Sequence, residues 1–323
     1  MATPVGVNVV TSIARRFIMP TIVDTVFSSN PLFYRWNAGN KRIVTGGTQI
    51  ELPFMYSRFG NGGPYQGYEV LDVAPNDTVK SGAWDWKQQY VPVTVDGLTL
   101  IKTDSPESIA NIIEQQFAQA ELEMRENLAV GIWSDGTGAK QIDGLEAAVD
   151  DGGVATTYAG LTRASNTWLN ATDDSTTATL TLAALQSMHG SVGEGGRQAT
   201  IIVSRQEPYN RYWNLLQEFQ RFPTQPGGHD QQLAAAGFSN LLFNGTPWVV
   251  DSHVFDGPDS SNSAIVFLNE DYINWVVSPR ADFYLEDFQK PVNQDAMTAK
   301  LLWAGNLVCQ NPGRQGKLTA IAA

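Results

Sequence analysis

Cysteine and histidine are scarce in this sequence. The 323 residues contain one cysteine, Cys309, which excludes an intramolecular disulfide framework. The three histidines, His189, His229 and His253, lie far apart and far from Cys309. The i, i+4 pair of a helical zinc site is therefore missing. We expect no metal and no cofactor.

Basic residues are outnumbered. Lys and Arg total 21 against 33 Asp and Glu, and the net charge at pH 7 is -12. A general nucleic-acid binder normally presents a basic face, so this composition argues against DNA binding. Residues 1–60 differ, because six basic residues stand there against two acidic ones. A basic arm on an acidic body can act between copies of one chain, and the alternative is a solvated segment without a role.

Long hydrophobic runs are missing too. No apolar stretch approaches the ~20 residues that span a bilayer, so we expect no membrane association. The first residues show no charged start followed by an apolar run and a small-residue cleavage site, which argues against a secretory signal. A hydrophobic content of 42% can still build a sizeable core. These features favour a folded protein assembled in a reducing cytoplasm.

Motifs for catalysis are equally sparse. There is no G-x-S-x-G elbow, and the glycine-rich residues 190–196 precede a predicted strand, whereas a nucleotide-binding loop follows one. Adjacent carboxylates at 150–151, 173–174 and 286–287 have the residue types of an acid–base pair, but such pairs on an acidic protein are usually solvated. Aromatic tracts at 84–90 and 209–213 favour core or interface packing over stacking on sugars or bases. We expect no enzyme, with a hydrolase or glycan-binding protein as an alternative.

The first hundred residues predict an arm and a hairpin. Residues 1–40 have little periodicity and three prolines, which indicates an extended arm with a short helix near 21–28. Residues 43–100 contain strand-like segments on both sides of a glycine-rich tip. A hairpin of this kind is marginal in water by itself, so it should pack on this chain or on another.

The most regular pattern in the sequence is a helix over residues 105–133. Ser105 suits its N-cap and Pro106 its first turn, and apolar residues recur near the helical period. After it come a short helix ending at Gly190 and a buried strand over 199–204. A helix then opens with the capping box Ser204 to Glu207, and a hairpin turns at Asn244-Gly245. Further strands are predicted at AIVFL, INWVV and TAKLLWAGNLVCQ, so the fold class is α+β.

The order of these parts resembles the major capsid proteins of tailed bacteriophages, which have the HK97-like fold. The local text is similar as well: SDGTG at 134–138, IDGL at 142–145, GLTRASNTW at 160–168 and FNGTPWVVD at 243–251. The resemblance implies an N-terminal arm at 1–42 and an extended loop at 43–100. It also implies a peripheral domain at 101–180 and 281–323 with a spine helix at 105–133, and an α/β axial domain at 181–280.

The resemblance also implies a function. A capsid protein would self-assemble through pentamers and hexamers into an icosahedral or prolate shell around double-stranded DNA, without sequence-specific binding. It would work with a separate scaffolding protein, a portal and decoration proteins, and would end in the virion after assembly in the host bacterial cytoplasm. An encapsulin-like nanocompartment shell, which packages enzymes, is the nearest alternative.

Two sets of residues follow from this expectation. Contacts between subunits are expected from basic and aromatic residues of the arm and loop: Arg15, Arg16, Lys41, Arg42, Arg58, Tyr65, Tyr68, Trp84 and Trp86. Structural roles are expected for Arg163, Asn166, Trp168 and Gly245. Trp168 should fill space against the long helix, and Arg163 and Asn166 should bind backbone groups or a neighbouring subunit.

Overall fold

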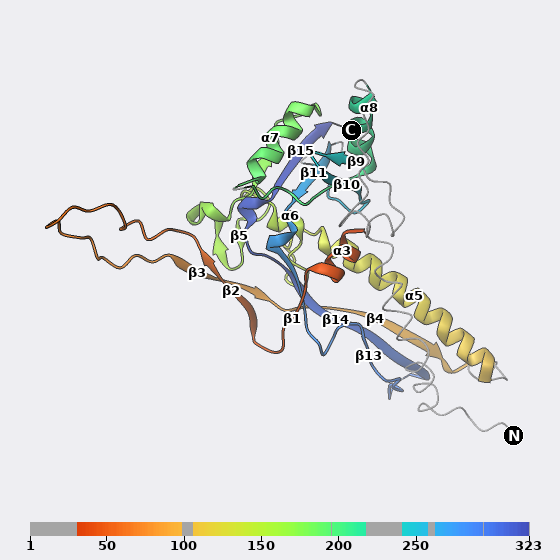
Figure 1. Cartoon of the computed structure of the whole chain (residues 1–323). Coiled ribbons are helices and arrows are strands. Elements are labelled where there is room, and N and C mark those ends of the chain that lie inside the picture. The colour runs from red at the N-terminus through yellow and green to blue at the C-terminus, as the bar shows by residue number, and fades with distance from the viewer. Residues whose placement is uncertain are drawn as a thin grey trace.

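The computed structural model describes residues 31–98, 106–194, 196–217, 241–257, 262–292 and 294–322. Two sheets and the helices that cover them form the body, and a two-stranded hairpin projects from it (Figure 1). The helices are α3 (Pro31–Gly39), α5 (Pro106–Ile132), α6 (Leu145–Ala148), α7 (Leu182–Val192) and α8 (Gln206–Gln217). None of the helices within these ranges is both long and apolar enough to cross a bilayer.

The first sheet has five strands built around the long strand β14 (Ala296–Cys309). One edge of β14 pairs with β4 (Lys87–Asp96), and the other edge pairs with β13 (Tyr284–Leu285) and then with β12 (Ile273–Val277). The short strand β1 (Lys41–Ile43) adds in parallel to β12. Along β4 buried side chains alternate with exposed ones. The buried ones lie on one face and pack in one core with the buried residues of α5. This is the alternation of a sheet with one covered face.

The second sheet has six strands in the order β7 (Thr172–Asp174), β15 (Gly316–Ala322), β11 (Asn262–Leu268), β8 (Ile201–Ser204), β10 (Thr246–Val250) and β9 (Leu241–Phe243). Every residue of β8 is buried. Ile201 and Val203 belong to the core shared with the first sheet, and Ile202 belongs to a second core with residues of α7 and α8. A sheet covered on both faces explains the continuous apolar runs in its strands.

The Asn244-Gly245 turn joins β9 to β10 as the sequence predicts. Both residues have positive φ, 49° and 83°, the geometry of a two-residue hairpin turn in which asparagine and glycine are favoured. The predicted helix over 105–133 is α5, although Ser105 lies outside the described residues, as does the short helix expected near 21–28.

The expectation of an extended chain is wrong for residues 31–39, and the strand pairing differs from the expected division of the chain. Residues 31–39 are a helix of the body, not an extended arm, because Leu32, Phe33 and Trp36 are buried and Arg35 binds Glu270 at 2.6 Å. Strand pairing also crosses the expected domain boundaries. β12 joins the sheet of β4 and β14, and β15 joins the sheet of β8 and β11, because a strand belongs to the sheet with which it makes its hydrogen bonds.

A polar contact joins α5 to the loop that follows β10. His253 places Nδ1 3.1 Å from Asp251 Oδ1 and Nε2 3.1 Å from Glu126 Oε1. Trp133 at the end of α5 donates to the other oxygen of Asp251 at 3.1 Å. The hydrogen bond to Asp251 outweighs burial and, together with Glu126, raises the pKa of His253 to about 9.

This contact gives the stability of the chain a pH dependence. A histidine whose pKa rises on folding contributes stability fully below its ordinary value of 6.5, and this contribution is lost as the pH rises through about 9. We expect the free energy of unfolding of the wild type to exceed that of His253→Gln by about 1 kcal/mol below pH 6.5. Above about pH 9 the two free energies should be equal. Urea unfolding of both proteins across pH measures the difference, and a gap that does not change with pH would contradict the assignment.

Candidate interaction surface

The projecting hairpin consists of β2 (Gln49–Met55) and β3 (Val79–Asp85), which pair in register from Gln49 with Asp85 to Met55 with Val79. The two strands alternate, and on one face Ile50, Phe54 and Trp84 are buried. These side chains belong to the main core of the body. The strands therefore fix the root of the hairpin, while the segment beyond Met55 extends away (Figure 1).

The segment Gly160–Trp168 packs against the root of the hairpin. It begins in the tight turn between β5 (Thr157–Tyr158) and β6 (Leu161–Thr162) and includes β6. The ring of Trp168 lies 5.2 Å from Phe54 and stacks at 5.9 Å on Tyr56, centroid to centroid. Trp168 therefore contacts the hairpin, a choice of partner that the local sequence does not encode, and its packing against the long helix stays a prediction.

Asn166 and Arg163 stabilise this segment by hydrogen bonds within the chain. Asn166 accepts from Lys80 of β3 at 2.8 Å and donates to the carbonyl of Thr162 at 2.9 Å. The buried guanidinium of Arg163 donates to the carbonyls of Asp150 and Ala147, both at 2.6 Å, and to those of Ala148 and Leu169. Multiple carbonyl acceptors are what a buried arginine needs.

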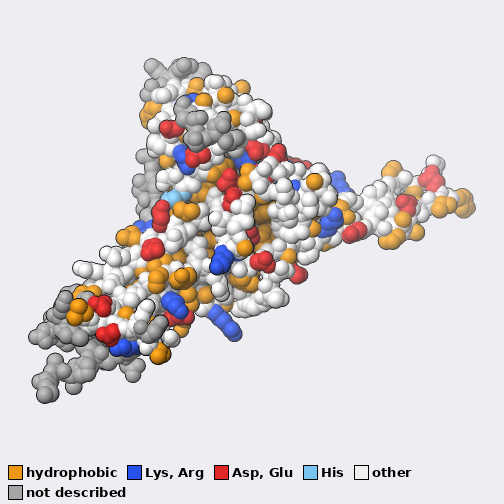
Figure 2. Space-filling view, turned by 180° about the vertical axis from the view of Figure 1, so that it is seen from behind, with side chains coloured by type: hydrophobic (Ala, Val, Ile, Leu, Met, Phe, Trp, Pro, Cys, Tyr) orange, Lys and Arg blue, Asp and Glu red, His pale blue; other side chains and the backbone are white. Residues whose placement is uncertain are grey.

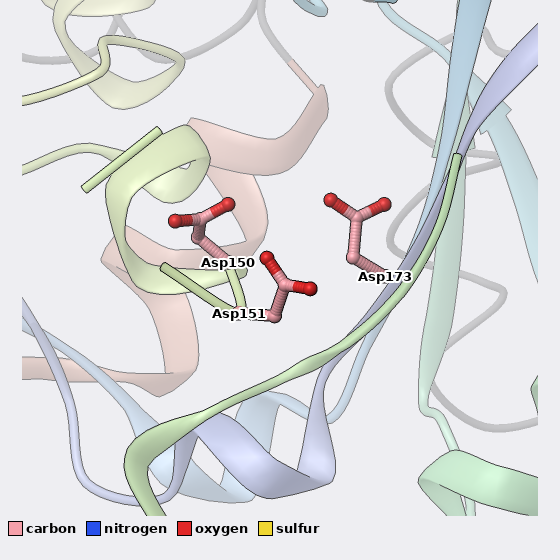
Figure 3. Close-up of side chains that lie close together, drawn as sticks. All are labelled: Asp150, Asp151 and Asp173. Atoms are coloured by element: carbon pink, nitrogen blue, oxygen red, sulfur yellow. The ribbon is translucent and has the colours of Figure 1, made fainter. Parts of the chain in front are cut away.

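Three carboxylates converge beside this segment: Asp150, Asp151 and Asp173 (Figure 3). Their nearest oxygens lie within 4.8 Å of one another, as they would around a cation. A cation is already present, because the ammonium of buried Lys317 lies 3.0 Å from Asp150 and 3.2 Å from Asp173. The cluster is therefore a structural ion pair network.

The hydrogen bonds of Asp150 also indicate a structural role. One carboxylate oxygen accepts from the backbone N–H groups of Gly152, Val154 and Ala155 at 2.9 to 3.0 Å, and the other accepts from Lys317. Burial opposes ionisation, but the N–H of Ala155 and the ammonium of Lys317 hold the pKa of Asp150 below its ordinary value. A carboxylate held in this way is a poor proton donor or acceptor at neutral pH.

Beyond its paired strands the hairpin presents an exposed apolar tip, residues 56–78. Six large hydrophobic side chains on or next to this tip are exposed: Met55, Phe59, Tyr65, Tyr68, Val70 and Val73. Figure 2 shows hydrophobic side chains gathered along this projection. Asn61 donates to the carbonyl of Ala74 at 2.8 Å, and Tyr56 donates through its hydroxyl to that of Asp77 at 2.7 Å, so the two limbs are tied together. An apolar surface of this kind marks an interaction site.

The residues expected at subunit contacts fall into different environments. Arg42, Arg58, Tyr65 and Tyr68 are exposed, and Trp86 is half-buried and donates to the carbonyl of Gly47 at 3.1 Å. Arg15 and Arg16 lie outside the described residues.

Two of the expected contact residues are used within the chain. Trp84 is 2% exposed and packs edge-on against Tyr158, so it cannot present its ring to a neighbour. Lys41 binds Asp282 of its own chain at 2.6 Å. In the second aromatic tract Tyr209 and Tyr212 are buried, and Tyr212 stacks on Trp248 at 4.6 Å. These rings contribute to cores and are not platforms for a sugar or a base.

The packing at the root of the hairpin predicts the effect of a small substitution. A Cβ at Gly82 would lie 2.2 Å from the Phe54 ring and 3.0 Å from Ala159. We expect Gly82→Ala to lower the free energy of unfolding by about 1–3 kcal/mol through overpacking. Gly63→Ala on the same hairpin is the matched control, since nothing lies within 4 Å of its Cβ. Equal urea midpoints for the two variants would contradict this packing.

The chain is similar to several solved structures. It matches the cyanophage A-1(L) capsid with a TM-score of 0.65 at 14% identity, over 91% of this chain and 93% of that chain. It matches the SrpI encapsulin from Synechococcus elongatus PCC 7942 with a TM-score of 0.58 at 10% identity, over 89% and 88%. The capsid of a native GTA particle gives 0.55 at 14% identity, over 90% of each chain. No family model and no curated protein matches in sequence. The chain has the HK97-like fold.

Proposed function

We propose that this protein is a major capsid protein that assembles into a closed shell around phage DNA. The observation that carries the proposal is the exposed apolar tip of a hairpin whose root is fixed in the body of an HK97-like fold. A projecting hairpin with an apolar tip is stabilised when another surface covers that tip. A second copy of the chain is a partner that is present wherever the protein is made.

The parts of the chain take their roles from this assembly. The hairpin would form the extended loop, α5 and the first sheet the peripheral domain, and the second sheet the axial domain. Heterologous contacts between copies would close into rings of five and six and then into a shell. The net charge of -12 would keep the inner wall from adhering to packaged DNA. Scaffolding, portal and decoration proteins would complete a virion assembled in the host cytoplasm.

The test is assembly itself. The chain is expressed alone and with a candidate scaffolding protein, and the products are examined by sedimentation and negative-stain electron microscopy. Closed shells, or rings of five and six, support the proposal. A monomer under both conditions overturns it.

A nanocompartment shell is the second candidate, favoured by the similarity to the SrpI encapsulin over 89% of this chain. Purified shells separate the two. Shells that form with a scaffolding protein, and that enclose DNA when the scaffolding protein is present, indicate a capsid. Shells that retain a host enzyme indicate a nanocompartment.

A further inference from the structure

The dipeptide Asn-Gly occurs twice in the sequence, at Asn61-Gly62 in the hairpin tip and at Asn244-Gly245 between β9 and β10. This dipeptide is chemically reactive where the backbone can bend, because the glycine nitrogen can attack the amide carbon of the asparagine side chain. Glycine favours the attack, since it has no Cβ and its backbone turns freely. The two copies of the dipeptide differ in how firmly the fold holds them.

The Asn244-Gly245 copy is held by its surroundings. It forms the two-residue turn of a hairpin in which Thr246 pairs with Phe243. Nδ2 of Asn244 also donates to Oε1 of Gln186 at 2.5 Å. Both residues of the dipeptide are exposed, so access of water does not limit the reaction. Attack by the Gly245 nitrogen would require the chain to leave the turn geometry that the paired strands impose.

The Asn61-Gly62 copy lies in a segment without regular structure. Residues 56–66 belong to neither a helix nor a strand, and Gly62 is exposed. A Cβ added at Gly62 would meet nothing within 4 Å, so the surroundings of its backbone nitrogen are open. The backbone can therefore bend at this position without breaking a strand pair.

A neighbouring amide is placed to assist the attack on Asn61. Nδ2 of Asn76 donates to Oδ1 of Asn61, and Nδ2 of Asn61 donates to the carbonyl of Ala74 at 2.8 Å. Attack on the side-chain amide carbon moves negative charge onto Oδ1. A donor already aimed at that oxygen stabilises the charge as it develops.

We propose that Asn61 is a site of spontaneous deamidation and that Asn76 assists the reaction. The nitrogen of Gly62 loses its proton to solvent and forms a bond to Cγ of Asn61. The bond from Cγ to Nδ2 breaks, and the amide nitrogen leaves as ammonia. Water then opens the five-membered imide at either carbonyl, which yields aspartate or isoaspartate. Water is the only co-reactant, and the inference does not depend on the proposed assembly.

The product changes the charge and the hydrogen bonding of the tip. Residues 56–78 carry one basic residue, Arg58, against three acidic ones, and deamidation adds a further negative charge. The new carboxylate replaces the donor to the carbonyl of Ala74 by an acceptor. Two acceptors that face each other repel, so the limbs of the tip lose one of the bonds between them.

Peptide mapping tests the choice of site. The unassembled wild-type chain is incubated at physiological temperature and mildly alkaline pH, and samples taken over time are digested and sequenced by mass spectrometry. Trypsin cleaves after Arg58 and Lys80, so one peptide contains Asn61. We expect it to gain the mass of a carboxyl in place of an amide at Asn61, with isoaspartate detected by isoaspartyl methyltransferase. Asn244 should keep its amide. Conversion at Asn244 as fast as at Asn61, or at neither, overturns the proposal.

Variants of the tip test the mechanism. Gly62→Ala should slow the conversion of Asn61 about twofold to fivefold, because alanine restricts the backbone beside the attacking nitrogen. Gly63→Ala is the matched control, since an added Cβ meets nothing within 4 Å at either glycine. It should convert at the wild-type rate. Equal rates for these two variants overturn the proposed attack by Gly62.

Asn76→Ala tests the assistance. Loss of one hydrogen bond to the developing charge should slow the conversion about twofold to tenfold. The same peptide map measures the rate. A rate that is unchanged or faster overturns the role of Asn76.

Discussion

Lys317→Met should unfold at a much lower urea concentration than the wild type, with a loss of about 3–5 kcal/mol in the free energy of unfolding. The substitution keeps the length of the side chain and removes its charge. Buried Asp150 and partly buried Asp173 then lie 3.0 and 3.2 Å from a position that no longer holds a cation. Unfolding of the unassembled chain is followed by tryptophan fluorescence.

Two further variants separate charge from packing. Lys290→Met removes an ion pair of similar length, 2.7 Å to Asp295, whose side chains are more than half exposed, and should cost less than about 1 kcal/mol. Adding Asp173→Asn to Lys317→Met should recover part of the loss, because it removes one of the two unpaired carboxylates. Failure to recover any stability would mean that packing of the lysine, and not its charge, stabilises the network.

Removal of the hairpin tip should abolish assembly while leaving the fold intact. The N–H of Tyr56 donates to the carbonyl of Thr78 at 3.0 Å, so the strands are still paired there. Residues 57–77 can therefore be replaced by Asn-Gly, which closes a two-residue turn. We expect the far-ultraviolet circular dichroism and the melting temperature of the monomer to change little, because the exposed tip contributes little to the core.

Assembly is measured by sedimentation at concentrations where the wild type forms particles. Two full-length variants refine the result: Tyr65→Ser with Tyr68→Ser should lose assembly, and the polar control Gln66→Ser should keep it. The apolar area of the tip would then be the cause. Normal particles from the shortened chain would show that the tip is dispensable.

Elements with a strong local signal could be predicted from the sequence. α5 is coded by apolar residues at the helical period over 27 residues, and the β9–β10 turn by Asn244-Gly245. α3 was missed although Pro31 opens it and Leu32, Phe33 and Trp36 follow at helical spacing. Arg35 of this helix binds Glu270, which lies 235 positions later in the sequence. No residue near Arg35 in the sequence indicates that partner.

The candidate site could be predicted only in outline. A glycine-rich segment between strands indicates an exposed tip, and the tip is exposed. Which tryptophans face outward depends on what the chain places against them. Trp84 is covered by Tyr158, and Trp168 by Phe54 and Tyr56. Lys317 gives no signal at all, because the carboxylates that bind it lie 167 and 144 positions earlier in the sequence.

The position of β15 has a consequence for the order of events on the ribosome. β15 lies between β7 and β11, and it carries Lys317 to Asp150 and Asp173. During translation the hairpin emerges before the counter-ion of Asp150 and Asp173 and before the strand that joins β7 to the second sheet. A nascent chain thus exposes its apolar tip before its body is complete, and chaperones would have to shield that tip.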